Sequence, residues 1–426
     1  MIQYFENAHG QLTSFIRLIA IKDRNFYYIL RPLMRLMEVN MSKKRVAVIF
    51  GGQSSEHEVS RVSAQSVIEN MDKAKYDLVM IGITKDGQWL TYEGPTDKIG
   101  SGEWQQLALT AYAEKNTQLL SGENTQAGAA EEKKYGELVQ TNTARGILGE
   151  SSKDKIDVIF PVLHGCNGED GTIQGLFELA GIPYVGCGVL GSAVGMDKAY
   201  TKIIFEKEGL PQGDYLVFSR KQVNFQLDEV IKEVEGRLTY PCFVKPSNAG
   251  SSVGVNKASS REELKRALDI AAKNDRRILV EEFINGREIE CAVLGNDNPI
   301  ASTVGEVVPC NEFYDYEAKY QVGDDSKVMI PAENLPAETV QKVREYAVRA
   351  FKCLDCAGLS RVDFFVHKIT GEIFINEINT LPGFTKISMY PKLWAASGIP
   401  YSELIDRLIE LAYERFEDGK REFTNS

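Results

Sequence analysis

The chain has 426 residues and carries 49 lysines and arginines against 60 aspartates and glutamates, a formal net charge of −11. Hydrophobic residues make up 43% of it, which is typical of a globular protein and too high for a disordered chain. An acidic chain lacks the basic surface of a nucleic-acid-binding protein, although a local basic groove for a phosphorylated ligand stays possible. At about 150 residues per domain, the length suggests roughly two or three domains.

The cysteines, histidines and apolar segments exclude further classes of protein. The 7 cysteines are spread along the chain, which predicts a reducing, cytoplasmic setting and no disulfide framework. Cys353 and Cys356 have redox spacing, but they close a predicted helix and are interpreted as buried small side chains. The 4 histidines lack metal-ligand spacing, so we expect no zinc site. No segment approaches the roughly 20 apolar residues that cross a membrane, so no membrane partner is expected.

Residues 1–40 differ from the rest in charge, because they carry an excess of basic residues on an acidic chain. Met41 follows directly and resembles a natural start before a strand. Three interpretations stay open: a product of an upstream start, an arginine-containing targeting segment, or an accessory helix. We favour a dispensable extension and exclude it from the fold prediction.

The first half of the chain alternates strands and helices. An apolar run at 45–50 ends in glycines and predicts a buried strand, and Ser55 with Glu58 forms a capping-box pattern that opens a helix to about Met71. Further strands are predicted at 77–83 and 158–162, and a helix at 171–179. This alternation predicts an α/β fold with a parallel sheet. The polar stretch 112–154 predicts a surface insertion with little helix.

The second half mixes strands with longer helices. Helices are predicted at 193–207, 261–272, 337–354 and 401–416, and strands at 243–246, 277–284, 359–366 and 372–378.

A glycine and serine loop at 250–254 follows the strand that carries Lys245. Small residues let backbone N–H groups approach an anion, and serine hydroxyls add donors. A tight hairpin turn would use similar residues, but a lysine inside an apolar strand requires an anionic partner. The pattern therefore favours a phosphate-binding loop of neither common nucleotide-binding type.

Two strands near the end of the chain carry polar residues that alternate with apolar ones. If Lys368 pairs with Glu372 across the turn, Asp363 lies opposite Glu377 and Arg361 opposite Asn379. Two carboxylates and an amide on one face are oxygen ligands suited to Mg²⁺. A merely solvated polar face is the alternative. The presence of Phe365, Ile373 and Ile375 on the same predicted face argues against it.

Residues 312–320 combine aromatic and charged side chains between predicted strands. The composition fits a lid that closes over a site, and equally an edge hairpin with surface tyrosines.

Taken together, seven segments resemble the D-alanine–D-alanine ligases, enzymes of the ATP-grasp fold. The segments, in chain order over about residues 43–416, are GGQSSEHEVS at 51–60, LHGCNGEDG at 163–171, MDK at 196–198, VKPSNAGSSVG at 244–254, FYDYEAKY at 313–320, RVD at 361–363 and NEINTLPG at 376–383. The resemblance implies an ATP- and Mg²⁺-dependent ligase that makes D-Ala-D-Ala for peptidoglycan precursors through an acyl-phosphate intermediate.

The resemblance also implies a nucleotide and metal site. Asp363, Glu377 and Asn379 would hold two Mg²⁺ or Mn²⁺ ions, with Glu377 bridging them. The residues implied for ATP are Lys198, Lys245 and Lys319 on the phosphates, Ser251, Ser252 and Val253 in the closing loop, Glu281, Glu282, Phe283 and Ile284 at the adenine, and Glu288 at the ribose.

The resemblance further places the two D-alanine molecules. Glu56, which from its position alone is a helix-capping carboxylate, would pair with the first substrate's ammonium in a set with Ser251 and Tyr320. The remaining implied contacts are His164 beside the first substrate, Ser388 and Met389 beside the second, and Arg361 with the Gly383 N–H as the oxyanion hole.

The expected domain boundaries follow from the same resemblance. We expect an N-terminal α/β domain at 41–187, a central ATP-grasp domain at 188–281 and a C-terminal ATP-grasp domain at 282–426, in a homodimer, as is common in the family. By the same resemblance, Tyr320 implies an amine nucleophile and a dipeptide product. A D-alanine–D-serine ligase stays open, because Met389 departs only mildly from the usual leucine, and so does a non-catalytic nucleotide-binding regulator.

Overall fold

The computed structural model describes residues 43–120, 155–250, 253–308 and 327–421. The chain divides into two compact units, residues 1–44 with 73–77 and residues 45–72 with 78–426, and the fold below is that of the larger unit. The predicted extension at 1–40 and residues 121–154 of the predicted insertion lie outside the described residues.

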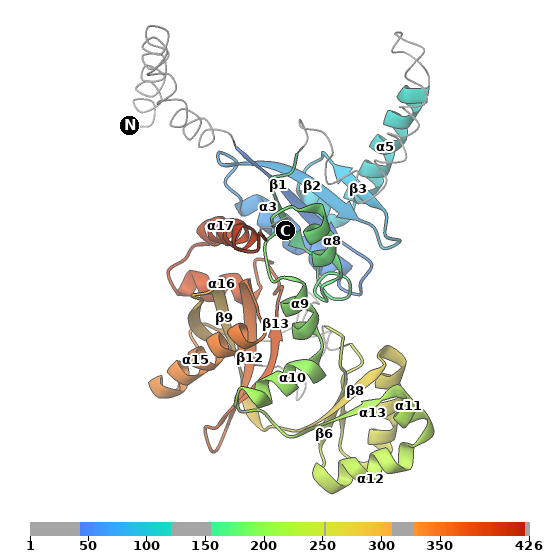
Figure 1. Ribbon diagram of the computed structural model, residues 1–426, viewed down its shortest axis with the longest axis vertical. Coiled ribbons are helices and arrows are strands. Elements are labelled where there is room, and N and C mark those ends of the chain that lie inside the picture. Colours follow the sequence, from blue (N-terminus) through green and yellow to red (C-terminus); the bar gives the residue numbers. More distant parts are fainter. Residues whose placement is uncertain (1–42, 121–154, 251–252, 309–326, 422–426) are drawn as a thin grey trace, which may run out of the picture. The chain divides into compact units, whose positions relative to one another are not determined.

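The first sheet has the strand order β3-β2-β1-β4 (Figure 1). β4 pairs with β1 in parallel, as predicted, but β3 adds an antiparallel edge to β2, so the sheet is mixed. The short β3 went unpredicted because four residues after a turn carry little periodicity. The elements are β1 (Lys44–Gly51), α3 (His57–Asn70), β2 (Tyr76–Ile83), β3 (Trp89–Tyr92), α4 (Asp97–Ser101), α5 (Trp104–Leu120), β4 (Val158–Val162) and α8 (Thr172–Ala180). Because α5 reaches Leu120, the start of the predicted low-helix insertion is helical.

The turn between β1 and α3 is tightly packed against the end of β2. Gly51 has a φ of +89°, and a Cβ there would lie 2.2 Å from the Ile83 carbonyl oxygen, so this position requires glycine. The predicted capping box is wrong: α3 begins at His57 with Glu56 at the N-cap, and the Glu58 carboxylate pairs with Lys85 at 2.6 Å.

The second sheet, of order β5-β8-β6-β7, is antiparallel. Its apolar residues form one core with α11, α12 and α13, which gather beside β6 and β8 in Figure 1. The elements are β5 (Tyr215–Ser219), α11 (Arg220–Phe225), α12 (Leu227–Arg237), β6 (Cys242–Pro246), β7 (Asn256–Ala258), α13 (Arg261–Asn274) and β8 (Arg277–Glu282). Strand β6 therefore displays Lys245 near its end.

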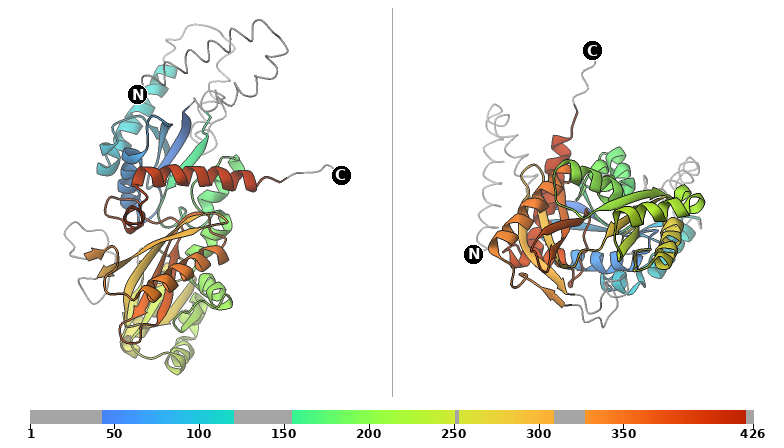
Figure 2. Two further views of the ribbon diagram at one scale, coloured as in Figure 1. Left: turned by 90° about the vertical axis from the view of Figure 1, so that its left-hand side faces the viewer. Right: turned by 90° about the horizontal axis from the view of Figure 1, so that it is seen from below.

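The third sheet, of order β11-β10-β9-β12-β13, is also antiparallel. Helix α15 packs on β9, β10, β12 and β13, and Figure 2 shows this orange helix lying along the sheet. The elements are β9 (Gly286–Gly295), β10 (Ile300–Val308), β11 (Lys327–Met329), α15 (Ala337–Cys353), β12 (Gly358–His367), β13 (Ile373–Asn379), α16 (Met389–Ala396) and α17 (Tyr401–Asp418). Whether the three sheets mark the three predicted domains stays a prediction.

The hairpin β12–β13 contains a β-bulge that the sequence analysis did not predict. Asp363 lies opposite Glu377 and Arg361 opposite Asn379, as predicted. At the turn, however, the His367 N–H donates to the Glu372 carbonyl at 2.8 Å, so the predicted pairing of Lys368 with Glu372 is wrong. The register shifts by one residue between Asp363 and Phe364, which restores the predicted pairing at the polar end.

The bulge also changes which side chains share the polar face. Ile373 and Ile375 join Phe364 in the core, whereas Phe374 does not. The prediction that Ile373 and Ile375 lie beside the carboxylates is therefore wrong, because one inserted residue reverses the alternation of a strand.

The predicted helix at 193–207 consists of two helices, α9 (Val189–Met196) and α10 (Lys198–Lys207). The break lies at Asp197, whose backbone is extended and whose carboxylate accepts from the Tyr200 N–H and from the Ser247 hydroxyl at 2.6 Å. The same carboxylate pairs with Arg277. Asp197 thus ties the start of α10 to the second sheet.

Among the described residues, no helix is both long enough and apolar enough to cross a membrane.

We expect Asp197→Ala to lower the free energy of unfolding by about 2 to 3 kcal/mol, because it removes a helix cap and one partner of a largely buried ion pair. Urea denaturation followed by circular dichroism measures this change. Asp269→Ala is the control, since its exposed pair with Lys273 at 2.7 Å should contribute less than about 1 kcal/mol. Equal losses in the two variants would contradict the assignment of Asp197.

Candidate functional site

A cavity of about 370 Å³ brings together residues from the second and third sheets and from α9 and α10. Its lining contains nine of the predicted site residues, which come from separate segments of the chain. They are Lys198, Lys245, Glu281, Glu282, Phe283, Ile284, Glu288, Glu377 and Asn379. A cavity of this size accommodates a small-molecule ligand.

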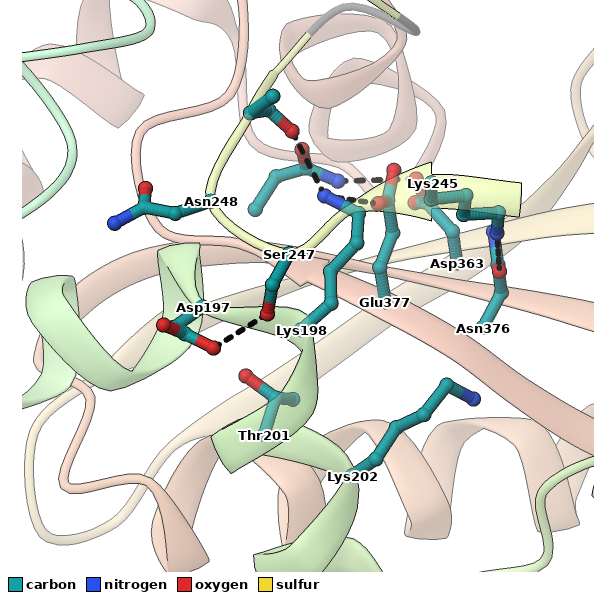
Figure 3. A network of polar contacts seen from close by, with 12 residues as sticks. Asp197, Lys198, Thr201, Lys202, Lys245, Ser247, Asn248, Asp363, Asn376 and Glu377 are labelled. Atoms are coloured by element: carbon teal, nitrogen blue, oxygen red, sulfur yellow. Dashed lines mark hydrogen bonds and ion pairs between the residues drawn. The ribbon is translucent and has the colours of Figure 1, made fainter. Parts of the chain in front are cut away.

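Lys198 is the first residue of α10 and points across the cavity toward the third sheet (Figure 3). Its Nζ lies 3.2 Å from Glu377 Oε2 and donates to the Ala249 carbonyl at 3.0 Å. Ala249 precedes the glycine and serine loop, so one ammonium joins α10, this loop and the end of β13. The helix break at Asp197 orients this side chain, because Asp197 is the N-cap of α10 and Lys198 is the first residue after it.

Lys245 and Lys202 share one carboxylate, that of Glu281. Lys245 Nζ lies 2.6 Å from Glu281 Oε2, and Lys202 Nζ lies 2.6 Å from Glu281 Oε1. Lys245 also donates to Asn376 Oδ1 at 3.4 Å (Figure 3). Burial opposes the charge on Lys245, but Glu281 and Glu377 outweigh it and raise the pKa of the lysine.

Lys202 was missed by the sequence analysis, although it lines the cavity and its side chain is only 4% exposed. The available signal was its spacing, since it lies one helical turn after Lys198 and therefore on the same face of α10.

Arg361 and the hairpin carboxylates form a buried charge cluster. The Arg361 guanidinium donates to both Asp363 oxygens, at 2.8 and 2.7 Å, and its Nε lies 2.9 Å from Glu290 Oε2. Asn379 Nδ2 donates to Asp363 Oδ2 at 3.0 Å. Burial would lower the pKa of Arg361, but Asp363 and Glu290 raise it well above its ordinary value. A polar face merely exposed to solvent is therefore excluded at this end, since Asp363 is 2% exposed.

The segment 282–284 gives the cavity a mixed wall. The Phe283 ring lies 6.1 Å from that of Phe243, and Lys257 Nζ lies 5.2 Å from its centroid. Glu282 accepts from the Asp214 N–H at 2.8 Å, and Glu288 lines the same cavity from β9. Apolar surface with a few polar groups is typical of a site for an aromatic ring.

Three predicted segments meet at Glu56. The carboxylate is 5% exposed and makes no capping hydrogen bond to α3. A Cβ at Gly165 would lie 2.7 Å from Glu56 Oε2, and a Cβ at Gly250 would lie 3.5 Å from it. The turn after β1, the segment after β4 and the glycine and serine loop therefore converge, although they are far apart in the sequence.

His164 lies beside this convergence and is 5% exposed. Its Nδ1 lies 3.2 Å from the Leu381 carbonyl oxygen and 3.9 Å from Glu169 Oε1, and its Nε2 lies 3.1 Å from Ser63 Oγ. Burial would lower the pKa of His164, but Glu169, with Glu56, outweighs burial and raises it.

Gly383 and Ser388 are neighbours, and neither they nor Met389 lines the cavity. A Cβ at Gly383 would lie 2.9 Å from Ser388 Oγ, which also accepts from the Thr385 N–H at 3.0 Å. Met389 is 6% exposed, and its sulfur would lie 2.8 Å from a Cβ at Gly305 on β10.

Several predicted site residues lie outside the described residues. These are Ser251, Ser252, Lys319 and Tyr320, together with the rest of the segment predicted at 312–320. Val253, at the edge of the described loop, donates its N–H to the Gly250 carbonyl at 3.1 Å.

The donor set of the hairpin fits a hard divalent cation. Within the described ranges no three His, Cys, Asp or Glu side chains converge as a metal site, but the hairpin offers two cross-strand carboxylates with an amide beside them. The ammonium of Lys198 already lies against Glu377, so this carboxylate faces a position that accepts positive charge. Oxygen-only ligation of this kind suits Mg²⁺ or Mn²⁺.

Comparisons with known proteins identify the family of the chain. Residues 45–187 match the family model "D-ala D-ala ligase N-terminus", and residues 204–410 match "D-ala D-ala ligase C-terminus". A D-alanine–D-alanine ligase of Ruminiclostridium cellulolyticum is 77% identical over 91% of this chain and 100% of its own length. One of Acetivibrio thermocellus is 61% identical over 89% of this chain and 99% of its own length.

Solved structures show the same fold. The VanG D-Ala:D-Ser ligase of Enterococcus faecalis has a TM-score of 0.71 and 39% identity, covering 87% of this chain and 100% of that one. The D-alanine–D-alanine ligase of Coxiella burnetii has a TM-score of 0.68 and 33% identity, covering 88% and 95%.

We expect Glu169→Gln to lower the pKa of His164, because it removes the carboxylate that stabilises the imidazolium. The stability that this imidazolium contributes is present below pH 6.5 and is lost as the pH rises through the raised folded pKa. In the Glu169→Gln variant, the stability contributed by the His164 imidazolium should therefore be lost at a lower pH. An NMR titration of the His164 ring measures the change. Asp170→Asn, which alters a neighbouring carboxylate that binds the Asn167 N–H at 2.9 Å, is the control. An unchanged His164 pKa in Glu169→Gln would contradict this account.

Proposed function

The chain belongs to the D-alanine–D-alanine ligase family and makes D-Ala-D-Ala, and we propose how the residues of its cavity carry out that ATP-driven reaction. The observation that carries the proposal is the meeting of Lys198 and Lys245 with Glu377 in one cavity. Cations beside carboxylates are what phosphoryl transfer requires, because the lysines bind phosphates and the carboxylates bind the metal that accompanies them.

Lys198 and Lys245, with Lys319, bind the ATP phosphates in this proposal. The loop containing Ser251, Ser252 and Val253 closes over the phosphates. The adenine lies against residues 281–284, where Phe283 offers an apolar face, and the ribose lies beside Glu288.

Asp363, Glu377 and Asn379 would hold two Mg²⁺ or Mn²⁺ ions. Bound there, the ions would supply positive charge that offsets the negative charge developing on the phosphates during transfer. Glu377 lies opposite Asp363 across the hairpin, and its carboxylate pairs with the Lys198 ammonium at 3.2 Å.

Glu56 receives the ammonium of the first D-alanine in this proposal. Its buried carboxylate lies beside the loop that carries Ser251, and Ser251 and Tyr320 complete the set. His164 lies beside the same substrate, whose carboxylate attacks the γ-phosphate of ATP to form an acyl phosphate and release ADP.

Arg361 and the Gly383 N–H stabilise the oxyanion that forms when the amine of the second D-alanine attacks the acyl phosphate. Collapse of this tetrahedral intermediate expels phosphate and leaves the peptide bond. The bidentate pair with Asp363 fixes the plane of the Arg361 guanidinium. Ser388 contacts the second D-alanine in this proposal, and its close approach to Gly383 supports this assignment. Met389, which was predicted beside the same substrate, is buried next to Gly305 and has only an indirect role in this proposal.

We extend the proposal to the setting of the enzyme. Peptidoglycan synthesis follows from D-Ala-D-Ala production, and we place the enzyme in the cytoplasm, where ATP is supplied. The sheets at 44–162, 215–282 and 286–379 support three domains with the boundaries predicted from the sequence. We also propose that the enzyme is a homodimer.

With ATP and Mg²⁺ present, phosphate should be released only when D-alanine is added, because phosphoryl transfer needs the carboxylate of D-alanine as acceptor.

A competition assay that offers D-alanine, D-serine and D-lactate, with product analysis by mass spectrometry, tests the identity of the second substrate. We expect D-Ala-D-Ala to dominate. Phosphate release independent of D-alanine, or mainly D-Ala-D-Ser, would contradict the proposal.

Asp363→Asn and Glu377→Gln should each lower kcat/KM at least about a hundredfold without unfolding the protein, because each removes a charged metal ligand but preserves shape. Phosphate release measures the loss, and thermal unfolding checks the fold. The exposed Asp297→Asn serves as the control. Full activity in either hairpin variant would refute the metal assignment.

A further inference from the structure

Lys202 is a buried cation that none of the seven family-like segments contains. Its side chain is 4% exposed, and its Nζ lies 2.6 Å from Glu281 Oε1 and 5.4 Å from the centroid of the Tyr215 ring. Because it lines the same cavity as Lys198 and Lys245, it is a further described lysine at the proposed nucleotide site.

Each oxygen of the Glu281 carboxylate pairs with a different lysine. Oε1 pairs with Lys202 and Oε2 with Lys245, both at 2.6 Å. Burial would raise the pKa of Glu281, but Lys202 and Lys245 outweigh burial and lower it to about 2. The carboxylate is therefore ionised at neutral pH, and the three side chains carry one net positive charge.

The two lysines differ in what else they can reach. Lys245 Nζ also contacts Asn376 Oδ1 at 3.4 Å, next to Glu377. Lys202 lies instead on α10, between Glu281 and the ring of Tyr215. Lys245 thus reaches toward β13 beside Glu377, whereas Lys202 is directed toward Tyr215 on β5.

Nucleotide binding would draw Lys245 away from Glu281, and a second lysine on Glu281 compensates for that loss. When Lys245 turns its ammonium toward a phosphate, its interaction with Glu281 weakens. A buried carboxylate without a counterion is costly, so a lone Lys245 would be held back by Glu281. A second lysine on the other oxygen removes that cost.

We propose that Lys202 is a positioning residue that neutralises Glu281 and thereby leaves Lys245 available to the nucleotide phosphates. This inference rests on the proposed function, since it assumes that the cavity binds ATP. Lys202 itself touches no phosphate in this scheme. The competing explanation is that Lys202 only packs α10 against the second sheet.

The first experiment compares a ligand that has phosphates with one that lacks them. Titration calorimetry with Mg²⁺ present and D-alanine absent gives the Kd of ATP and of adenosine for Lys202→Met. We expect the Kd of ATP to rise about tenfold or more and that of adenosine to change less than about twofold. Lys207→Met, an exposed lysine on the same helix, should leave both unchanged. Equal weakening of the two ligands would show a packing role and overturn the proposal.

The second experiment is a double-mutant cycle with Glu281→Gln. Without the carboxylate there is no charge for Lys202 to neutralise, so Lys202→Met in the Glu281→Gln background should change the Kd of ATP less than about threefold. The same loss in both backgrounds would overturn the proposal. If Lys202→Met does not fold, Lys202→Gln, which keeps a hydrogen-bond donor but no charge, takes its place with the same expectations.

The ATP titrations distinguish a failure of the proposed function from a failure of the role given to Lys202. If the unmodified protein binds no ATP, the proposed function itself fails. If it binds ATP, and Lys202→Met binds ATP equally well, only the role of Lys202 fails.

Discussion

The mutual neutralisation of buried charges is the constraint on which the cavity depends. Lys198, Lys202 and Lys245 enter it from α10 and β6, and Glu281 and Glu377 face them from β8 and β13. Any of these charges left unpaired in such a place would be costly, because the surrounding protein cannot solvate it as water does. The charges therefore keep two sheets and a helix in one arrangement that presents cations where an anionic ligand would bind.

The third sheet meets the same constraint with different residues. Arg361 lies between Asp363 and Glu290, on neighbouring strands, so two carboxylates can be buried close together without repelling each other unchecked. The β-bulge beside Asp363 lets the strand keep Ile375 in the core and still turn Glu377 toward the cavity. Core packing and the polar site thus use one hairpin without conflict.

Sequence reasoning reached the correct pairing of Asp363 with Glu377 through an incorrect turn. Glu372 pairs with His367 and not, as was predicted, with Lys368, and the bulge compensates for this difference of one residue. Sequence reasoning also predicted one helix across Asp197, because the apolar pattern continues through that position. A pattern of local periodicity cannot show that an aspartate is bound by Ser247 and Arg277, which lie far along the chain.

By itself the sequence determined most strands and helices, the family and the identity of most candidate residues, because periodicity and short motifs are local properties of the chain. It could not show that Lys202 shares Glu281 with Lys245, or that Glu56 lies beside Gly250 instead of capping α3. Those contacts join residues that are distant in the sequence. They exist only because the packing of separate sheets and helices brings the residues together, so tertiary structure alone decided them.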